Sequence, residues 1–262
     1  MGDAHCDAIL AACAPDTASP EAAQRALRGS FGQLMSLAAG MVAPLVATLT
    51  QRLNAKPRGD LTPHEALAVR LEQQYGADVG VLACFFLNHV ILQPGEAVAL
   101  AANEPHAYVA GQCVECMATS DNVVRAGLTP KLRDVGTLCA MLTYTQDPPR
   151  VMTGDGQAAG TRVKTYDPSF DEFCVDTFSA AQSSEVVTLP PSDGPSLVLL
   201  TSGAATLTAT PRDGTAAPTQ LAARAGSAVV VLPGHSIGVQ PTGDAAAAGV
   251  RARVNDAVFT TA

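Results

Sequence analysis

The chain has 262 residues and a formal net charge of −8, with 47% hydrophobic and 15% charged residues. This composition is typical of a globular protein and excludes an intrinsically disordered one. No apolar run is long enough for a transmembrane helix and no basic stripe is present, so we expect neither a membrane nor a nucleic-acid partner. Seven cysteines and no visible signal peptide predict reduced thiols in a cytoplasmic protein of one to three domains.

Helical periodicity dominates the first part of the chain, after a loose terminus over residues 1–19. From Glu21 to Asn54 the apolar residues recur at steps of three or four, as Leu27, Phe31, Leu34, Ala38, Met41, Leu45 and Leu49. Pro44 is expected to kink this helix or to start a second one, because proline lacks the backbone donor that a helix interior needs.

A further helix is predicted from the residues at its ends. Thr62-Pro63-His64-Glu65 has the pattern of a capping box with proline at the first helical position. Gly76 is suited to end the helix. Residues 1–78 are therefore predicted to be a loose N-terminus and a small helical unit.

Three short strands separated by turns are predicted next. They are an apolar run too short to span a membrane, Val81–Leu92, followed by Ala97–Ala101 and Cys113–Thr119. Turns rich in Pro, Asn and Asp bring His106 and Arg125 to positions just outside these strands. Because this layout is typical of a β-barrel rim with inward polar groups, residues 79–146 are predicted to form part of a barrel.

Two features of the third predicted strand leave alternatives open. Alternation places Cys113, Glu115 and Met117 on one face, where a carboxylate is costly unless it is paired, catalytic or solvated. Cys113 and Cys116 form a CxxC, a pattern found in redox pairs and zinc ribbons. No second CxxC and no paired histidine follow, which favours two ordinary strand cysteines.

Turn residues and short strands fill the C-terminal part. Residues 147–160 are rich in Pro and Gly and are predicted to be a linker or surface loop. Short strands are then predicted at Ser196–Thr201, Ala204–Thr210, Ser227–Leu232, Ser236–Gln240 and Val250–Val254. Residues 147–262 are thus predicted to be a linker and a jelly-roll-like β domain, which could fold by itself from about Val186. His235 follows Pro233-Gly234, where a turn histidine is favoured over a ligand.

Several stretches resemble one protein family. NEPHAY, CVECMATSDN and VRAGLTPKLRDVGTLCAMLTY are similar to the type I phosphomannose isomerases, also called mannose-6-phosphate isomerases, and LRGSFGQLM resembles the entry to their helical insertion. The resemblance implies a mainly β fold with a helical segment, built of cupin-like jelly-roll barrels of which the first is incomplete here. It also implies a zinc enzyme that interconverts mannose 6-phosphate and fructose 6-phosphate and feeds GDP-mannose synthesis.

The resemblance also implies roles for individual residues. His106 matches a zinc ligand, Glu115 lies near the metal as an acid/base candidate, and Arg125 lies over the sugar and stabilises the enediolate. Lys131 matches the family's TPK and is expected to bind the substrate phosphate. Arg133 is added here as a second source of positive charge for that phosphate. The expected partner is a small sugar phosphate, and no protein partner is predicted.

The zinc ligands are where the chain departs from the family pattern. The family holds zinc with a Gln-x-His pair, a Glu and a later His, and only the last of these has a match, in His106. None of the five histidines has Gln two positions before it, and a catalytic zinc needs about three protein ligands. We therefore expect an incomplete copy of the isomerase. An inactive sugar-phosphate-binding or interaction protein remains the alternative, and an unrelated cupin-like protein a third possibility.

Overall fold

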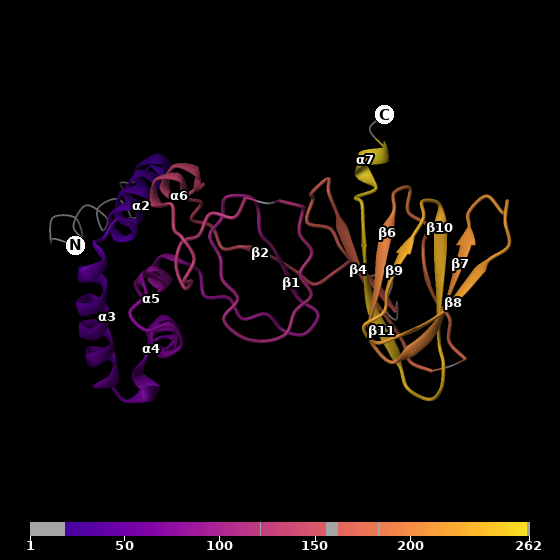
Figure 1. The fold of residues 1–262 in the computed structure, drawn as a ribbon, viewed down its shortest axis with the longest axis horizontal. Helices are drawn as coiled ribbons and strands as arrows, with labels where there is room; N and C mark the ends of the chain where they lie inside the picture. The colour runs from indigo at the N-terminus through magenta and orange to yellow at the C-terminus, as the bar shows by residue number, and fades with distance from the viewer. Residues whose placement is uncertain (1–18, 121, 156–161, 183, 261–262) are drawn as a thin grey trace. The chain divides into compact units, whose positions relative to one another are not determined.

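The computed structural model describes residues 19–120, 122–155, 162–182 and 184–260 (Figure 1). These residues divide into two compact units. The first comprises the described residues up to Ile91 with Leu100–Gly111 and Ser120–Arg150, and the second comprises Leu92–Ala99, Gln112–Thr119 and the residues from Val151 onward. The stretch predicted as one part of a barrel is therefore shared between the two units, and the three-part division at residues 78 and 146 stays a prediction.

Two helices set at a sharp angle begin the first unit. α2 (Pro20–Met35) and α3 (Ala39–Asn54) meet at 106°, and the Ser19 hydroxyl caps α2 by accepting a hydrogen bond from the Ala22 amide. Pro44 does not start a second helix, because it lies inside α3 and the chain turns earlier, at an extended Ala38, whereas the kink expected at Pro44 stays a prediction. This turn lets both helices bury apolar side chains in one core.

Length and hydrophobicity bear on whether these helices could cross a membrane. No single helix in the described part of the chain is both long and apolar enough to cross a membrane. The bent pair of α2 and α3 meets the criterion of length and composition only when its two helices are counted together.

The capping box predicted for the next helix is confirmed. α4 (Pro63–Tyr75) follows a short 3₁₀ turn, η1 (Arg58–Asp60). The Thr62 hydroxyl accepts a hydrogen bond from the Glu65 amide, and the Glu65 carboxylate accepts one from the Thr62 amide at 2.9 Å. Gly76 ends the helix with a φ of 64°.

The predicted strand Val81–Leu92 is wrong. Its first part forms a short helix, α5 (Val79–Ala83), which runs into a 3₁₀ turn, η2 (Cys84–Phe86), and its remainder is irregular. A short apolar run fits a buried helix as well as a buried strand, so periodicity alone does not decide between them. The Asp78 carboxylate favours the helix over the strand, because it accepts a hydrogen bond from the Gly80 amide and so caps α5.

The barrel part predicted over residues 79–146 has little regular strand. β1 (Ala97–Ala99) confirms the middle predicted strand over three residues, and in the described part of the chain it pairs with β2 (Arg150–Met152), which lies in the predicted linker. The predicted strand Cys113–Thr119 is wrong, because this segment is irregular. Strand conformation depends on pairing with a neighbouring strand, and the sheets formed by the described residues do not include this segment. α6 (Val135–Met141) completes the first unit and buries Leu138 in its core.

A β-sandwich of two sheets makes up most of the second unit (Figure 1). One sheet has the strand order β3–β4–β11–β6–β9 and the other β5–β10–β7–β8. The bounds are β3 Val163–Tyr166, β4 Cys174–Ala180, β5 Val187–Leu189, β6 Ser196–Ser202, β7 Ala204–Pro211, β8 Thr219–Arg224, β9 Ala228–Val231, β10 His235–Pro241, β11 Ala247–Arg253, and α7 Ala257–Thr260 follows. The five predicted strands correspond to β6, β7, β9, β10 and β11.

A buried ion pair lies within the five-stranded sheet. Arg251 on β11 and Asp176 on β4 are cross-strand partners, and each is 1% exposed. The Arg251 Nε donates to the Asp176 Oδ2 at 2.8 Å, and the Arg253 Nε donates to the same oxygen at 3.1 Å. The Thr165 hydroxyl donates to the other carboxylate oxygen at 2.7 Å. These partners offset the cost of burying the carboxylate.

Candidate active-site residues

The His106 ring is fixed by a contact with its own backbone, of the same kind as the contact that His235 makes with Pro233. Its Nδ1 lies 2.9 Å from the carbonyl oxygen of Glu104, and since that oxygen can only accept, Nδ1 carries the proton. The turn that allows this contact contains Asn103, whose φ is 64°. The ring is exposed, so its Nε2 is accessible, as a metal ligand requires, and the zinc-ligand role of His106 stays a prediction. The Tyr108 ring lies 5.9 Å away between centroids.

Arg125 lies in a segment that two carboxylates hold in place. Asp78 accepts a hydrogen bond from the Leu128 amide at 2.8 Å, and Asp134 accepts one from the Thr137 amide at 2.9 Å and so caps α6. This Thr137 hydrogen bond lowers the pKa of Asp134. Arg125 is half-buried and lies three residues before the first of these points, Leu128.

The two expected phosphate ligands belong to the same segment. Lys131 is exposed and Arg133 is half-buried, and the Lys131 amide donates to the Thr129 hydroxyl at 3.2 Å. Among the described residues, no ion pair joins either side chain, or that of Arg125, to a carboxylate. Three cations within nine residues, in a chain with a net charge of −8, favour an anionic ligand here.

Glu115 is separated from the other predicted residues by the division into units. It lies in Gln112–Thr119, which groups with the second unit, whereas His106 and Arg125 lie in the first. Its side chain is exposed, and without a strand at this point the predicted alternation of faces does not apply. The acid/base role of Glu115 therefore stays a prediction.

The structure also bears on the remaining candidate ligands. Cys113 and Cys116 are free thiols, and burial raises the pKa of Cys116, which works against a thiolate that binds zinc or drives redox chemistry. His235 places its Nδ1 2.9 Å from the Pro233 carbonyl oxygen, as expected of a turn histidine. In the described ranges, no group of three or more His, Cys, Asp or Glu side chains could hold a metal ion. His106 fits zinc as one ligand, but the described residues do not complete a set.

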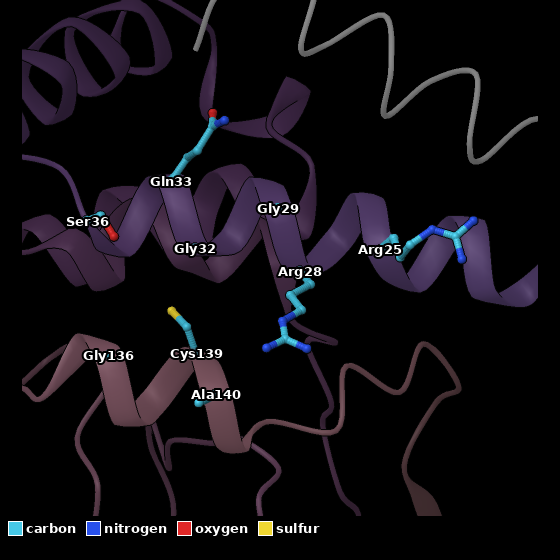
Figure 2. A pocket seen from close by; sticks show the side chains of 9 residues that line it. All are labelled: Arg25, Arg28, Gly29, Gly32, Gln33, Ser36, Gly136, Cys139 and Ala140. Atoms are coloured by element: carbon cyan, nitrogen blue, oxygen red, sulfur yellow. The ribbon is translucent and has the colours of Figure 1, made fainter.

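A groove that the sequence did not reveal lies between α2 and α6 (Figure 2). It has a volume of about 730 Å³ and is broadly open to solvent. Its lining residues are Arg25, Arg28, Gly29, Gly32, Gln33, Ser36, Gly136, Cys139 and Ala140. The Arg28 guanidinium also lies 5.8 Å from the centroid of the Tyr144 ring, a cation–π contact that holds it at the rim. None of the predicted site residues lines this groove.

The fold resembles that of known sugar-phosphate isomerases. A mutant phosphomannose isomerase from Salmonella typhimurium superposes with a TM-score of 0.71 at 23% identity, over 88% of this chain and 56% of that one. A zinc-bound mannose 6-phosphate isomerase gives a TM-score of 0.68 at 23% identity, over 88% and 55% of the two chains. The fold class predicted from the sequence, mainly β with a helical segment and cupin-like, is confirmed.

Sequence comparison specifies the family. Residues 2–87 match the model of the phosphomannose isomerase type I, helical insertion domain. Mannose-6-phosphate isomerase 2 of Arabidopsis thaliana is 47% identical over 174 residues, 66% of this chain and 39% of that protein. The mannose-6-phosphate isomerase of Bos taurus is 39% identical over 191 residues, 71% of this chain and 45% of that protein. The chain is thus a relative of the type I phosphomannose isomerases, as its sequence predicts, and spans less than half the length of these two relatives.

Proposed function

We propose that this chain provides the His106 and Arg125 side of a zinc-dependent isomerase that interconverts mannose 6-phosphate and fructose 6-phosphate. The observation that supports this most directly is the 47% identity to a mannose-6-phosphate isomerase over 174 residues. The segment with Arg125, Lys131 and Arg133 adds physical support, because its three cations suit a phosphorylated sugar. The remaining zinc ligands would come from outside the described residues.

In this proposal each residue has a defined part of the reaction. Lys131 and Arg133 bind the substrate phosphate, and Glu115 moves the proton between the two adjacent sugar carbons. Arg125 stabilises the negative charge of the enediolate, since a guanidinium is a permanent cation. Zinc bound through His106 would act as a Lewis acid on the sugar oxygens.

Zinc and substrate binding test this assignment directly. We expect residues 1–262, titrated with zinc against a chelator, to bind the ion weakly and to lose that binding on His106→Ala. His235→Ala is the matched control and should leave zinc binding unchanged. We expect mannose 6-phosphate, measured by NMR titration, to bind less well to Lys131→Ala than to Lys164→Ala, whose exposed lysine lies on β3. Equal affinities in the two lysine variants contradict the proposed phosphate site.

A non-catalytic sugar-phosphate-binding protein is the second candidate function. It is favoured by one observation, that the described residues hold no three-ligand metal cluster. A coupled assay of fructose 6-phosphate formation separates the two. Turnover when the chain is combined with a source of the other ligands supports the isomerase, and binding without turnover under the same conditions supports the second candidate. For residues 1–262 with zinc alone we expect no turnover.

The proposal extends to cellular context. We propose a cytoplasmic location and a reaction that supplies mannose 6-phosphate for GDP-mannose synthesis. Fluorescence microscopy of the tagged chain tests the location. Depletion of the chain should lower the cellular GDP-mannose concentration, and an unchanged concentration contradicts the metabolic role.

A further inference from the structure

The Asp78 carboxylate connects two parts of the first unit that are distant in sequence. Its Oδ1 accepts a hydrogen bond from the Gly80 amide at 2.7 Å, and this bond caps α5. The same oxygen accepts a second hydrogen bond from the Leu128 amide at 2.8 Å, fifty residues further along the chain. One half-buried side chain thus fixes both the start of α5 and the segment that follows Arg125.

Two glycines bring these segments into direct backbone contact. A Cβ atom on Gly127 would lie 2.9 Å from both the Cα and the amide nitrogen of Gly80, and one on Gly80 would lie 2.6 Å from the Leu128 side chain. Real Cβ atoms do not approach other atoms this closely, so neither position has room for another residue. The hydrogen bond from Leu128 to Asp78 depends on this approach.

Leu128 itself has an unfavourable backbone conformation. Its φ is 55°, in the left-handed region that non-glycine residues rarely adopt. Such a conformation persists when its surroundings hold it, and it is common near functional sites. The hydrogen bond to Asp78 is the contact that fixes the Leu128 amide in this orientation.

We propose that Asp78 is a positioning residue for the Arg125–Lys131 segment, an inference that rests on the proposed function. Arg125 lies three residues before Leu128 and Lys131 three residues after it, so the orientation at Leu128 sets the directions in which both cations leave the backbone. Asp78 acts through Leu128 and does not touch the sugar. Small displacements of binding groups can lower a reaction rate by about a hundredfold, so we expect loss of the hydrogen bond between Asp78 and Leu128 to impair the proposed reaction.

Two substitutions separate this role from simple helix capping. Asp78→Ser keeps an oxygen that can cap α5, because serine is a good N-cap residue, but its side chain is too short to reach the Leu128 amide as well. Asp78→Asn keeps an acceptor of the same reach for both amides. Thr62→Ala is the matched control, since it removes a cap from α4 in the same unit without altering the Arg125–Lys131 segment.

Amide hydrogen exchange and limited trypsin digestion of residues 1–262 provide the readout. In Asp78→Ser we expect the Leu128 amide to exchange about tenfold faster or more, as loss of a hydrogen bond to a charged acceptor predicts. Trypsin should cleave after Arg125 and Lys131 correspondingly faster. Asp78→Asn should restore most of the protection, and Thr62→Ala should leave both measurements at the level of the unmodified chain.

Substrate binding then distinguishes the positioning role from the proposed function. We expect Asp78→Ser to weaken mannose 6-phosphate binding to about the same extent as Lys131→Ala. Unchanged Leu128 exchange and unchanged cleavage in Asp78→Ser overturn the inference. If the unmodified chain binds no mannose 6-phosphate, the proposed function fails, while exchange and digestion still decide whether Asp78 holds the segment. Normal sugar binding with faster exchange shows that Asp78 is structural only and also overturns the positioning role.

Discussion

Arg125 and Lys131 are assigned from sequence similarity and from their place in one held segment, so single substitutions are the direct test of their roles. In an active isomerase that contains this chain, we expect Arg125→Ala to lower turnover by on the order of a hundredfold or more, because it removes a group that stabilises developing negative charge. Arg125→Lys should recover little of this loss, since lysine lacks the planar guanidinium.

The control for Arg125 is an arginine outside the segment. Arg58 lies exposed on η1, so Arg58→Ala should leave turnover within about twofold of the unmodified enzyme. Circular dichroism should show the same helix content in all three variants. Turnover of Arg125→Ala close to that of Arg58→Ala places Arg125 outside the active site.

Asp176 is the residue at which we expect the largest effect on stability. Asp176→Ala leaves Arg251 buried without its partner, so we expect the free energy of unfolding to fall by about 3–5 kcal/mol. Asp193→Ala breaks an exposed ion pair with Arg212 and should cost about 1 kcal/mol or less. Urea denaturation of the two variants measures the difference, and equal losses contradict the assigned role of the buried pair.

Among the elements, those with local signals were predicted well. The α4 capping box depends on residues three positions apart, and the strands of the β-sandwich are bounded by glycine and proline turns, so both can be read from the sequence. Val81–Leu92 was predicted wrongly as a strand because a short apolar run fits a helix equally well, and the local cap by Asp78 that favours the helix was not recognised. Cys113–Thr119 was predicted wrongly because alternation along one segment does not supply the neighbouring strand that a strand needs.

The candidate site was predicted less completely than the fold. Sequence similarity predicts roles for His106, Arg125 and Lys131 that stay predictions, and it did not reveal that Asp78 contacts the segment between the last two. The contact joins residues fifty positions apart, and no local pattern encodes it. The two glycines that permit it, Gly80 and Gly127, stand in ordinary sequence contexts and become informative only when their mutual approach is known.

The α4 capping box should respond to acid. The pKa of Glu65 is lowered to about 2, mainly by the hydrogen bond that its carboxylate accepts from Lys56 and next by the one from the Thr62 amide. Because the pKa in the folded state lies below that of the unfolded chain, the stabilisation is present above the ordinary glutamate pKa of 4.5 and is lost as pH falls from there towards 2. NMR titration should give Glu65 a pKa well below 4.5, and Glu65→Gln should abolish the loss of α4 helicity over this range. A pKa of Glu65 near 4.5 contradicts the capping geometry.

In the whole molecule, the strand order determines which part of the chain we expect to fold alone. A fragment that begins at Val186, as the sequence suggested, lacks β3 and β4 and leaves β11 without one of its two neighbours. It also lacks Phe178 and Ala180 from the core of the sandwich. We therefore expect residues 162–262 to unfold cooperatively with heat and residues 186–262 to show no cooperative transition. A cooperative transition in the shorter fragment contradicts this assignment.

Among the described residues, each compact unit has a deeply buried thiol. Cys84 in the first unit is 5% exposed and Cys174 in the second is 2% exposed, and burial raises the pKa of both to about 11. Since only an accessible thiolate reacts readily with an alkylating reagent, neither cysteine should be labelled at neutral pH until its own unit opens. The rates of alkylation at Cys84 and Cys174, followed by mass spectrometry, therefore report how fast each unit opens, and both rates come from one chain without any substitution.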